Sequence, residues 1–371
     1  MISDITTRVY EARAQRVLFG AGHASEALRG ELQLIGSQRI LLVAGQAEVE
    51  HAALITAGLP VVATFTDVRQ HVPAESATQA RLMAREAHAD VVVCVGGGST
   101  TGTAKVVALT EKLPIVAVPT TYAGSEATDV WGLTHNERKT NGSDPVVLPR
   151  SVIYDAELTV TLPPRLSVTS GLNALAHCVD ALWGPSPSAP ATGLATEGIR
   201  LLRQALPAVL ADGGDLLARA EAQEATYVAA SAFASAGSGL HHKICHVLGG
   251  AFGLDHAAMH AVLLPHVVGF NAPAADQAAS RIAAALAPSS KGTALELLLD
   301  FYDEIDAPRS LGALGLKATD VGQAAELALA KVPQGNPRPV REDQLRDLIG
   351  RAQAGEAPVE VAYDTAKETS R

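Results

Sequence analysis

Short runs rich in valine and isoleucine alternate with segments of helical periodicity through the first part of this sequence. The apolar runs are bounded by Gly, Pro or Asp, and they occupy residues 39–45, 60–65, 90–98, 114–121 and 151–155. Segments between them, such as 74–89, carry apolar residues at helical spacing. Strands that are apolar throughout and alternate with helices indicate a parallel sheet covered by helices on both faces. The fold class predicted for this part is therefore α/β.

The strand signals stop at about residue 156, and the sequence beyond is rich in Ala and Leu with signals typical of helices. Because 371 residues are too many for one ordinary hydrophobic core, we predict two domains. A Rossmann-like, parallel-sheet, nucleotide-binding domain covers residues 1–156, and an all-helical domain covers residues 157–371. The cleft between them is the expected ligand site. The polar residues 354–371 are expected to form a loosely held tail.

Composition narrows the choice of partners. The formal net charge is −10 and there is no basic cluster, which argues against nucleic acid. No apolar run approaches the ~20 residues that cross a bilayer, and the first residues lack the apolar stretch of a signal peptide, so we expect a cytoplasmic protein with no membrane partner. The three cysteines lie far apart without a CxxC pair, so neither a disulfide framework nor a thiolate zinc site is indicated. The expected ligand is a small molecule.

A glycine-rich turn follows the strand expected at 90–98. Its glycines let the backbone approach a ligand closely, and the helix behind it offers amide groups to an anion. The turn matches neither common fingerprint, because Thr101 and Thr103 stand where GxGxxG and the P-loop need Gly and Lys. A tight turn that binds nothing is the alternative. A second polar turn at 118–128 follows another apolar strand, and the two together favour a dinucleotide crevice. The predicted cofactor-binding residues are Gly96, Gly97, Gly98, Ser99, Thr100, Thr120, Thr121 and Ser125.

The choice between NADH and NADPH depends on charge after an early strand. Dinucleotide-binding enzymes often place a carboxylate there to hold the ribose hydroxyls of the adenosine. The run at 39–45 ends in Ala44 and Gly45, with no carboxylate. Because nothing there repels the extra phosphate of NADPH, we predict that NADH and NADPH are both accepted.

Histidines gather between residues 237 and 260. They are His241, His242, His246, His256 and His260. His242 and His246 are four residues apart, as are His256 and His260, so each pair can share one helix face. So many titratable groups in an apolar, glycine-rich context indicate a functional site, although His241 and His260 taken singly are more typical of buried structural histidines. Lys243 among them disfavours a divalent cation and favours a carboxylate substrate or a developing oxyanion.

Asn173 and His177 form another pair four residues apart in a predicted helix. Aspartate at position 173 would make this pair half of a metal site. The neutral amide of asparagine is a poor ligand for a transition metal. The pair therefore raises the question of whether the chain holds a metal at all.

Over nearly its whole length the chain resembles the iron-containing (group III) alcohol dehydrogenase family. It carries, in the order and spacing of that family, the stretches VGGGST, VPTTYAGSE, GLNALAH, CHVLGG and VLLPHV. Within the family it is most similar to the maleylacetate reductases, through the stretches HVP (71–73), PTTYAGSEATDVWG and HHKICHVLGG. The resemblance implies a homodimer.

In that family an Asp and a His of one helix and two later histidines hold a metal. The resemblance places these ligands at Asn173, His177, His242 and His256, and it matches His246 to a histidine near the nicotinamide. The three histidines are kept and the carboxylate is not. Because this loss removes the only anionic ligand and the oxygen that suits iron, we expect no metal.

The resemblance also implies an activity, the NAD(P)H-dependent reduction of the carbon–carbon double bond of maleylacetate, a small dicarboxylate, to 3-oxoadipate in the degradation of aromatic compounds. Hydride addition to the carbon β to the ketone leaves an enolate, which needs a positive or hydrogen-bonding group. We assign Lys243 and one of His242 or His256 to the enolate oxygen or a substrate carboxylate. His177 and His246 are candidates for proton delivery.

Two more side chains are candidates for the site. Asn173 can form a hydrogen bond with substrate without a metal. Tyr122, in the turn at 118–128, either supplies a hydroxyl at the cleft or serves only in packing.

Two other functions stay open. The first is a metal-dependent alcohol or polyol dehydrogenase of the same fold, with zinc or iron held by the three histidines. The second is a nucleotide-sensing protein without catalysis, which would have no reason to keep both the histidine cluster and Lys243.

Overall fold

A six-stranded parallel sheet forms the N-terminal part of the protein. The computed structural model describes residues 10, 12, 14–135 and 138–363. The strand order is β1-β8-β5-β4-β2-β3, and every neighbouring pair is parallel. The strands are β1 (Arg16–Gly20), β2 (Ile40–Ala44), β3 (Val61–Phe65), β4 (Val91–Gly96), β5 (Ile115–Pro119) and β8 (Ser151–Asp155). The predicted α/β class is confirmed, and the five predicted strands are present.

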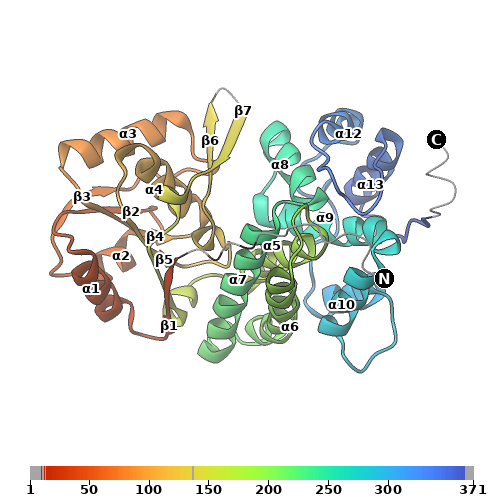
Figure 1. Cartoon of the computed structure of the whole chain (residues 1–371), viewed down its shortest axis with the longest axis horizontal. Helices are drawn as coiled ribbons and strands as arrows, with labels where there is room; N and C mark the ends of the chain where they lie inside the picture. Colours follow the sequence, from red (N-terminus) through yellow and green to blue (C-terminus); the bar gives the residue numbers. More distant parts are fainter. Residues whose placement is uncertain (1–9, 11, 13, 136–137, 364–371) are drawn as a thin grey trace.

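Helices cover both faces of this sheet (Figure 1). They are α1 (Ala24–Ile35) and α2 (Val49–Ile55) on one face, and α3 (Ala74–Glu86) and α4 (Gly98–Glu111) on the other. Successive side chains of a strand point to opposite faces, so Val93 packs with the first pair of helices and Val92 with the second. β4 is buried along its whole length, which is why its sequence is a continuous apolar run.

The sequence pattern predicts no strand at β1 or in the hairpin of β6 (Val130–His135) and β7 (Arg138–Ser143). β1 is a partly exposed edge strand, and it has no run of Val and Ile. β7 has the polar sequence RKTNGS. A pattern that depends on burial therefore misses both. The hairpin extends from the sheet to contact α8, in the helical part (Figure 1).

The chain beyond β8 is helical, and α5 lies at its centre (Figure 1). Every residue of α5 from 170 to 183 is buried, and α6, α7 and α9 pack against it. α7 also contacts β1 and β8, which joins the helical part to the sheet. The helices are α5 (Pro164–Trp183), α6 (Ala189–Ala211), α7 (Leu216–Ala236), α8 (Leu240–Phe252), α9 (His256–Asn271), α10 (Asp276–Leu286), α11 (Ala294–Glu304), α12 (Val321–Leu329) and α13 (Glu342–Ala354). No helix in the described part of the chain combines the length and apolar character that a membrane span requires.

The predicted loose tail is wrong for the part that the structure describes. The amide of Val361 donates to the carbonyl oxygen of Gly269, and Arg338 Nη1 donates to the carbonyl oxygen of Val361 at 2.7 Å. These bonds hold residues 359–363 against α9. Residues 364–371 of the predicted tail lie outside the described residues.

Candidate active site

The two turns predicted to bind a dinucleotide touch each other at the carboxyl ends of β4 and β5. Gly96 ends β4 with φ 149°, a conformation that favours glycine, and its carbonyl oxygen accepts a hydrogen bond from the amide of Thr120. A methyl group on Gly97 would lie 2.9 Å from Thr121 Cγ2, and one on Gly98 would lie 3.2 Å from Ala123 Cβ. The glycines therefore permit the close approach of the two turns.

The first turn of α4 is open to an anion. Gly97 is its N-cap residue and provides no side-chain cap, so the first amide groups of this helix remain available to a ligand. This glycine cradle fits the pyrophosphate of a dinucleotide. The hydroxyl of Thr100 packs under Gly96, so its side chain supports the turn. Ser125 lies in the short helix η1 (Ser125–Ala127), and its hydroxyl is buried without a hydrogen-bond partner among the described residues.

Lys105 of α4 holds the second turn in place, and the sequence analysis did not single it out. Its ammonium is buried and donates to the carbonyl oxygens of Ser125 at 2.6 Å and of Thr128 and Val130 at 2.8 Å. Burial lowers the pKa of Lys105 to about 7, while Glu126 and Asp129 act in the opposite direction. The sequence offered one sign of this role, because a lysine two turns into an otherwise apolar helix needs a buried partner.

The structure corrects the premise that no carboxylate lies at the end of β2. Glu48 folds back there, and a methyl group on Gly45 would lie 2.8 Å from its Oε2 atom. The glycine makes room for this carboxylate. Negative charge is therefore present where the ribose of an adenosine is held in related folds.

The histidines predicted from two distant stretches meet between α5, α8 and α9. The rings of His177 and His242 are 4.9 Å apart, and Phe233 of α7 packs against both, at 4.8 and 4.3 Å between centroids. The His242 ring lies 6.3 Å from that of His246, and the His256 ring lies 4.4 Å from that of His260. Burial lowers the pKa of His177 to about 4 and that of His242 well below its usual value. These rings are therefore neutral near pH 7.

Asn173 and Gly124 connect this histidine cluster to the turn after β5. Asn173 Nδ2 donates to the carbonyl oxygen of Ala123 at 3.4 Å, while Asn173 Oδ1 is buried without a partner among the described residues. A methyl group on Gly124 would lie 3.3 Å from the His177 ring. Asn173 and His177 of α5 thus lie directly against the turn after β5 that is predicted to bind the cofactor.

Asp180, one turn after His177 on α5, is a further site residue that the sequence analysis missed. Its Oδ2 atom lies 2.8 Å from His242 Nδ1 and accepts a hydrogen bond from the His242 amide at 3.1 Å. The carboxylate is completely buried at the N-terminus of α8. Burial raises the pKa of Asp180 to about 7, and the amides of His242, His241 and Gly239 oppose this rise.

Lys243 lies in the first turn of α8, next to His242, and is partly buried. Consecutive residues of a helix point about 100° apart, so Lys243 and His242 leave α8 in different directions. The predicted role of Lys243 toward a substrate carboxylate or enolate stays a prediction.

Of the two roles left open for Tyr122, a hydroxyl at the cleft or packing alone, the structure favours packing. Its side chain is fully buried, and its hydroxyl lies 3.3 Å from Arg219 Nη1 and 3.5 Å from Thr159 Oγ1. Arg219, also fully buried, donates to the carbonyl oxygens of Gly213 and Leu162. Tyr122 therefore packs in the interior.

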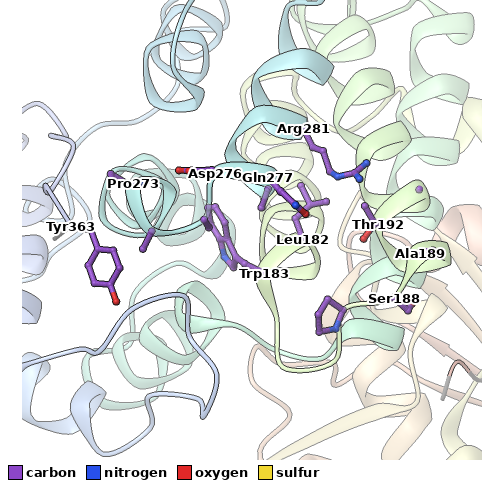
Figure 2. A pocket seen from close by; sticks show the side chains of 15 residues that line it. Leu182, Trp183, Ser188, Ala189, Thr192, Pro273, Asp276, Gln277, Arg281 and Tyr363 are labelled. Carbon is purple, nitrogen blue, oxygen red and sulfur yellow. The ribbon is translucent and has the colours of Figure 1, made fainter. Parts of the chain in front are cut away.

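A cavity of about 950 Å³ lies elsewhere, beyond the C-terminal end of α5 (Figure 2). Trp183 and Leu182 of α5, Thr192 of α6 and Arg281 of α10 are among the residues that line it. None of the residues predicted for the active site lines this cavity, so it does not define the candidate site.

Comparison with known proteins assigns the chain to a family. Residues 14–156 match the family described as iron-containing alcohol dehydrogenase, and residues 167–353 match its C-terminal part. The chain belongs to the iron-containing alcohol dehydrogenase family. This confirms the resemblance seen in the sequence motifs.

Relatives in this family include both curated proteins and solved structures. The maleylacetate reductase of Burkholderia cepacia is 44% identical over 354 residues, which cover 94% of this chain and 99% of that protein. A crystal structure of an iron-containing alcohol dehydrogenase from Corynebacterium glutamicum is 47% identical, with a TM-score of 0.92 over 95% of this chain and 98% of that one. The maleylacetate reductase structure from a Rhizobium species is 39% identical, with a TM-score of 0.89 over 95% of this chain and 100% of that one.

The family name implies iron, and the donor atoms at the four positions predicted as ligands do not fit it. Asn173 brings an amide in place of a carboxylate, so the set holds no anion to neutralise a divalent cation. Within the described residues, the atoms that converge as ligands belong to a neighbouring group, His241, Cys245 and His260. His241 Nε2 and His260 Nδ1 are already 3.0 Å apart, at hydrogen-bond distance, and burial raises the pKa of the Cys245 thiol well above its usual value.

Proposed function

We propose that this chain is a maleylacetate reductase that uses NADH or NADPH. The reaction takes maleylacetate, NAD(P)H and one proton to 3-oxoadipate and NAD(P)⁺. The observation that carries the proposal is the contact between the histidine cluster and the turn after β5, through Asn173 and Gly124. Curated relatives named maleylacetate reductase, 38% to 44% identical over at least 92% of this chain, support it.

The glycine turn at 96–98 and the first turn of α4 would hold the pyrophosphate of the cofactor. When bound, the nicotinamide supplies the hydride. Ser99, Thr121 and Ser125 are the polar side chains proposed to contact the cofactor. For Thr100 and Thr120, also predicted to bind it, we propose instead that they stabilise the turns through their contacts with Gly96. Asn173 Oδ1 is an acceptor, and the maleylacetate dianion has no strong donor. A bound nicotinamide would therefore offer Asn173 Oδ1 a better partner, its carboxamide N–H, than the substrate that the sequence analysis proposed for Asn173.

The substrate side of the site must stabilise negative charge on the substrate and on the enolate that forms from it. Hydride addition to the carbon β to the ketone moves charge to the ketone oxygen, and a fixed cation or donor there lowers the barrier. Lys243 supplies the ammonium. Of the two histidines predicted to act with it, His256 is the proposed donor, because His242 turns its Nδ1–H to Asp180 and leaves an acceptor at Nε2. His177 or His246 then passes a proton to the carbon next to the ketone. A neutral ring such as His177 does this as a relay, taking a proton from water on one ring nitrogen as it gives up the proton on the other.

The proposal includes no metal, and one experiment tests this. NADH oxidation is followed with maleylacetate in the presence and absence of EDTA, and the metal content of the purified protein is measured. We expect turnover that EDTA does not change, with metal well below one equivalent per chain. Activity that EDTA abolishes and zinc or iron restores would instead identify a metal-dependent dehydrogenase, with the metal at the three site histidines or at His241, Cys245 and His260. NADH binding without turnover of maleylacetate or alcohols would indicate a nucleotide sensor.

The homodimer and the cytoplasmic location expected from the sequence remain part of the proposal. The degradation of aromatic compounds is the proposed context of the reaction.

A further inference from the structure

We propose that Asp180 is a positioning residue that fixes the ring orientation and tautomer of His242. Its carboxylate accepts the Nδ1–H of His242 and leaves Nε2 as the ring nitrogen that meets the ligand. The expected effect on kcat rests on the proposed function, whereas the tautomer of His242 does not depend on it.

Two hydrogen bonds converge on one carboxylate oxygen of Asp180. Oδ2 lies 2.8 Å from His242 Nδ1 and 3.1 Å from the His242 amide nitrogen. The His242 amide and the positive end of α8 stabilise the ionised form of this carboxylate, which can only accept hydrogen bonds. The ring nitrogen that faces it therefore carries the proton. Because both the backbone and the ring of His242 are held by the same oxygen, the ring has little freedom to rotate.

The other ring nitrogen points to a missing ligand. His242 Nε2 is buried and has no hydrogen-bond partner among the described residues, and His242 as a whole is only 3% exposed. A buried polar atom without a partner is costly, so such an atom next to a functional cluster indicates a group that binds there. The neighbouring ring of His177 stacks on His242 and leaves the ring edge, rather than its face, for that group.

The chain makes room for this arrangement at Gly239. A methyl group on Gly239 would collide with Asp180 Oδ1, so only glycine lets the start of α8 approach the carboxylate so closely. Gly239 is the N-cap residue of α8 and has no side chain to cap the helix. The carboxylate of Asp180, which comes from α5, takes that place and lies at the positive end of the helix dipole.

The decisive variant is Asp180→Asn, compared with Asp180→Glu and with Glu31→Gln. The asparagine keeps the shape but offers an N–H group to Nδ1, which favours the other tautomer, as in catalytic triads where the same change lowers kcat. Glu31 is matched in burial, at 2% exposed, and binds Arg16 and Ser151 at the opposite end of the strands. Glu31→Gln therefore controls for the loss of a buried carboxylate.

We expect Asp180→Asn to lower kcat by about tenfold or more, with the KM for NADH changed by no more than about twofold. Asp180→Glu should recover part of the loss, and Glu31→Gln should keep the wild-type kcat. ¹⁵N NMR of histidine-labelled protein, with the His242 signals assigned through His242→Gln, should find the Nδ1–H tautomer in the wild type. It should also find a shift toward Nε2–H in Asp180→Asn.

An unchanged kcat in folded Asp180→Asn, or an Nε2–H tautomer in the wild type, would overturn the inference. If Asp180→Asn does not fold, two measurements still test the inference. They are the tautomer of His242 in the wild type and the kcat of Asp180→Glu. A wild-type protein that does not reduce maleylacetate would refute the proposed function, while its NMR spectrum would still test the role of Asp180.

Discussion

The rings of His177 and His242 lie face to face, with 4.9 Å between their centroids and 17° between their planes, although they come from different helices. Two imidazolium cations would repel each other at this distance in a buried site. Burial lowers the pKa values of both rings, so they stack as neutral groups. The stacked pair lies one turn of α5 away from Asn173, and we predict that substrate and metal would compete for this place.

Asn173→Asp should raise the affinity for divalent metal and lower reductase activity. The new carboxylate would restore the anionic ligand beside His177, and a bound cation would occupy the space proposed for substrate. Zinc titration and kcat/KM with maleylacetate measure the two effects. Asn271→Asp is the matched control, because Asn271 is equally buried but pairs with Asn336. If neither affinity nor activity changes in Asn173→Asp, the loss of this ligand does not explain a metal-free site.

Lys243→Met should lower kcat/KM for maleylacetate by at least about tenfold, which corresponds to ~1.4 kcal/mol of transition-state stabilisation. Methionine keeps much of the side-chain volume and removes the cation proposed to hold the enolate or a carboxylate. Lys291→Met, in the exposed loop before α11, controls for the loss of one positive charge from the chain. An unchanged kcat/KM would remove Lys243 from the mechanism.

Glu48→Gln should shift the cofactor preference toward NADPH. The carboxylate at the end of β2 lies where it can repel a ribose phosphate, and the amide keeps its size without its charge. We expect the ratio of kcat/KM for NADPH to that for NADH to rise about tenfold, because one unit charge at close range has an effect of this order. Glu50→Gln, on the exposed side of α2, should leave the ratio unchanged. Equal ratios in wild type and Glu48→Gln would place the adenosine away from Glu48.

The histidine cluster shows which contacts of a site can be predicted from residue spacing alone. His242 and His246 share a face of α8, and the sequence predicted this because four-residue spacing is a local property of a helix. The contact of His242 with Asp180 is not local, since it depends on how α8 packs at the end of α5. No spacing rule connects the two positions.

The sequence by itself determined the parallel sheet, the positions of its buried strands, the two turns at the carboxyl ends of β4 and β5, and the family. Periodicity and motif order encode these features along the chain. Only the tertiary structure decided that Glu48 returns a carboxylate to the end of β2, that Tyr122 faces Arg219 in the interior, and that Asp180 holds His242. The physical reason is that side-chain direction and burial are set by packing between elements, which no local pattern records.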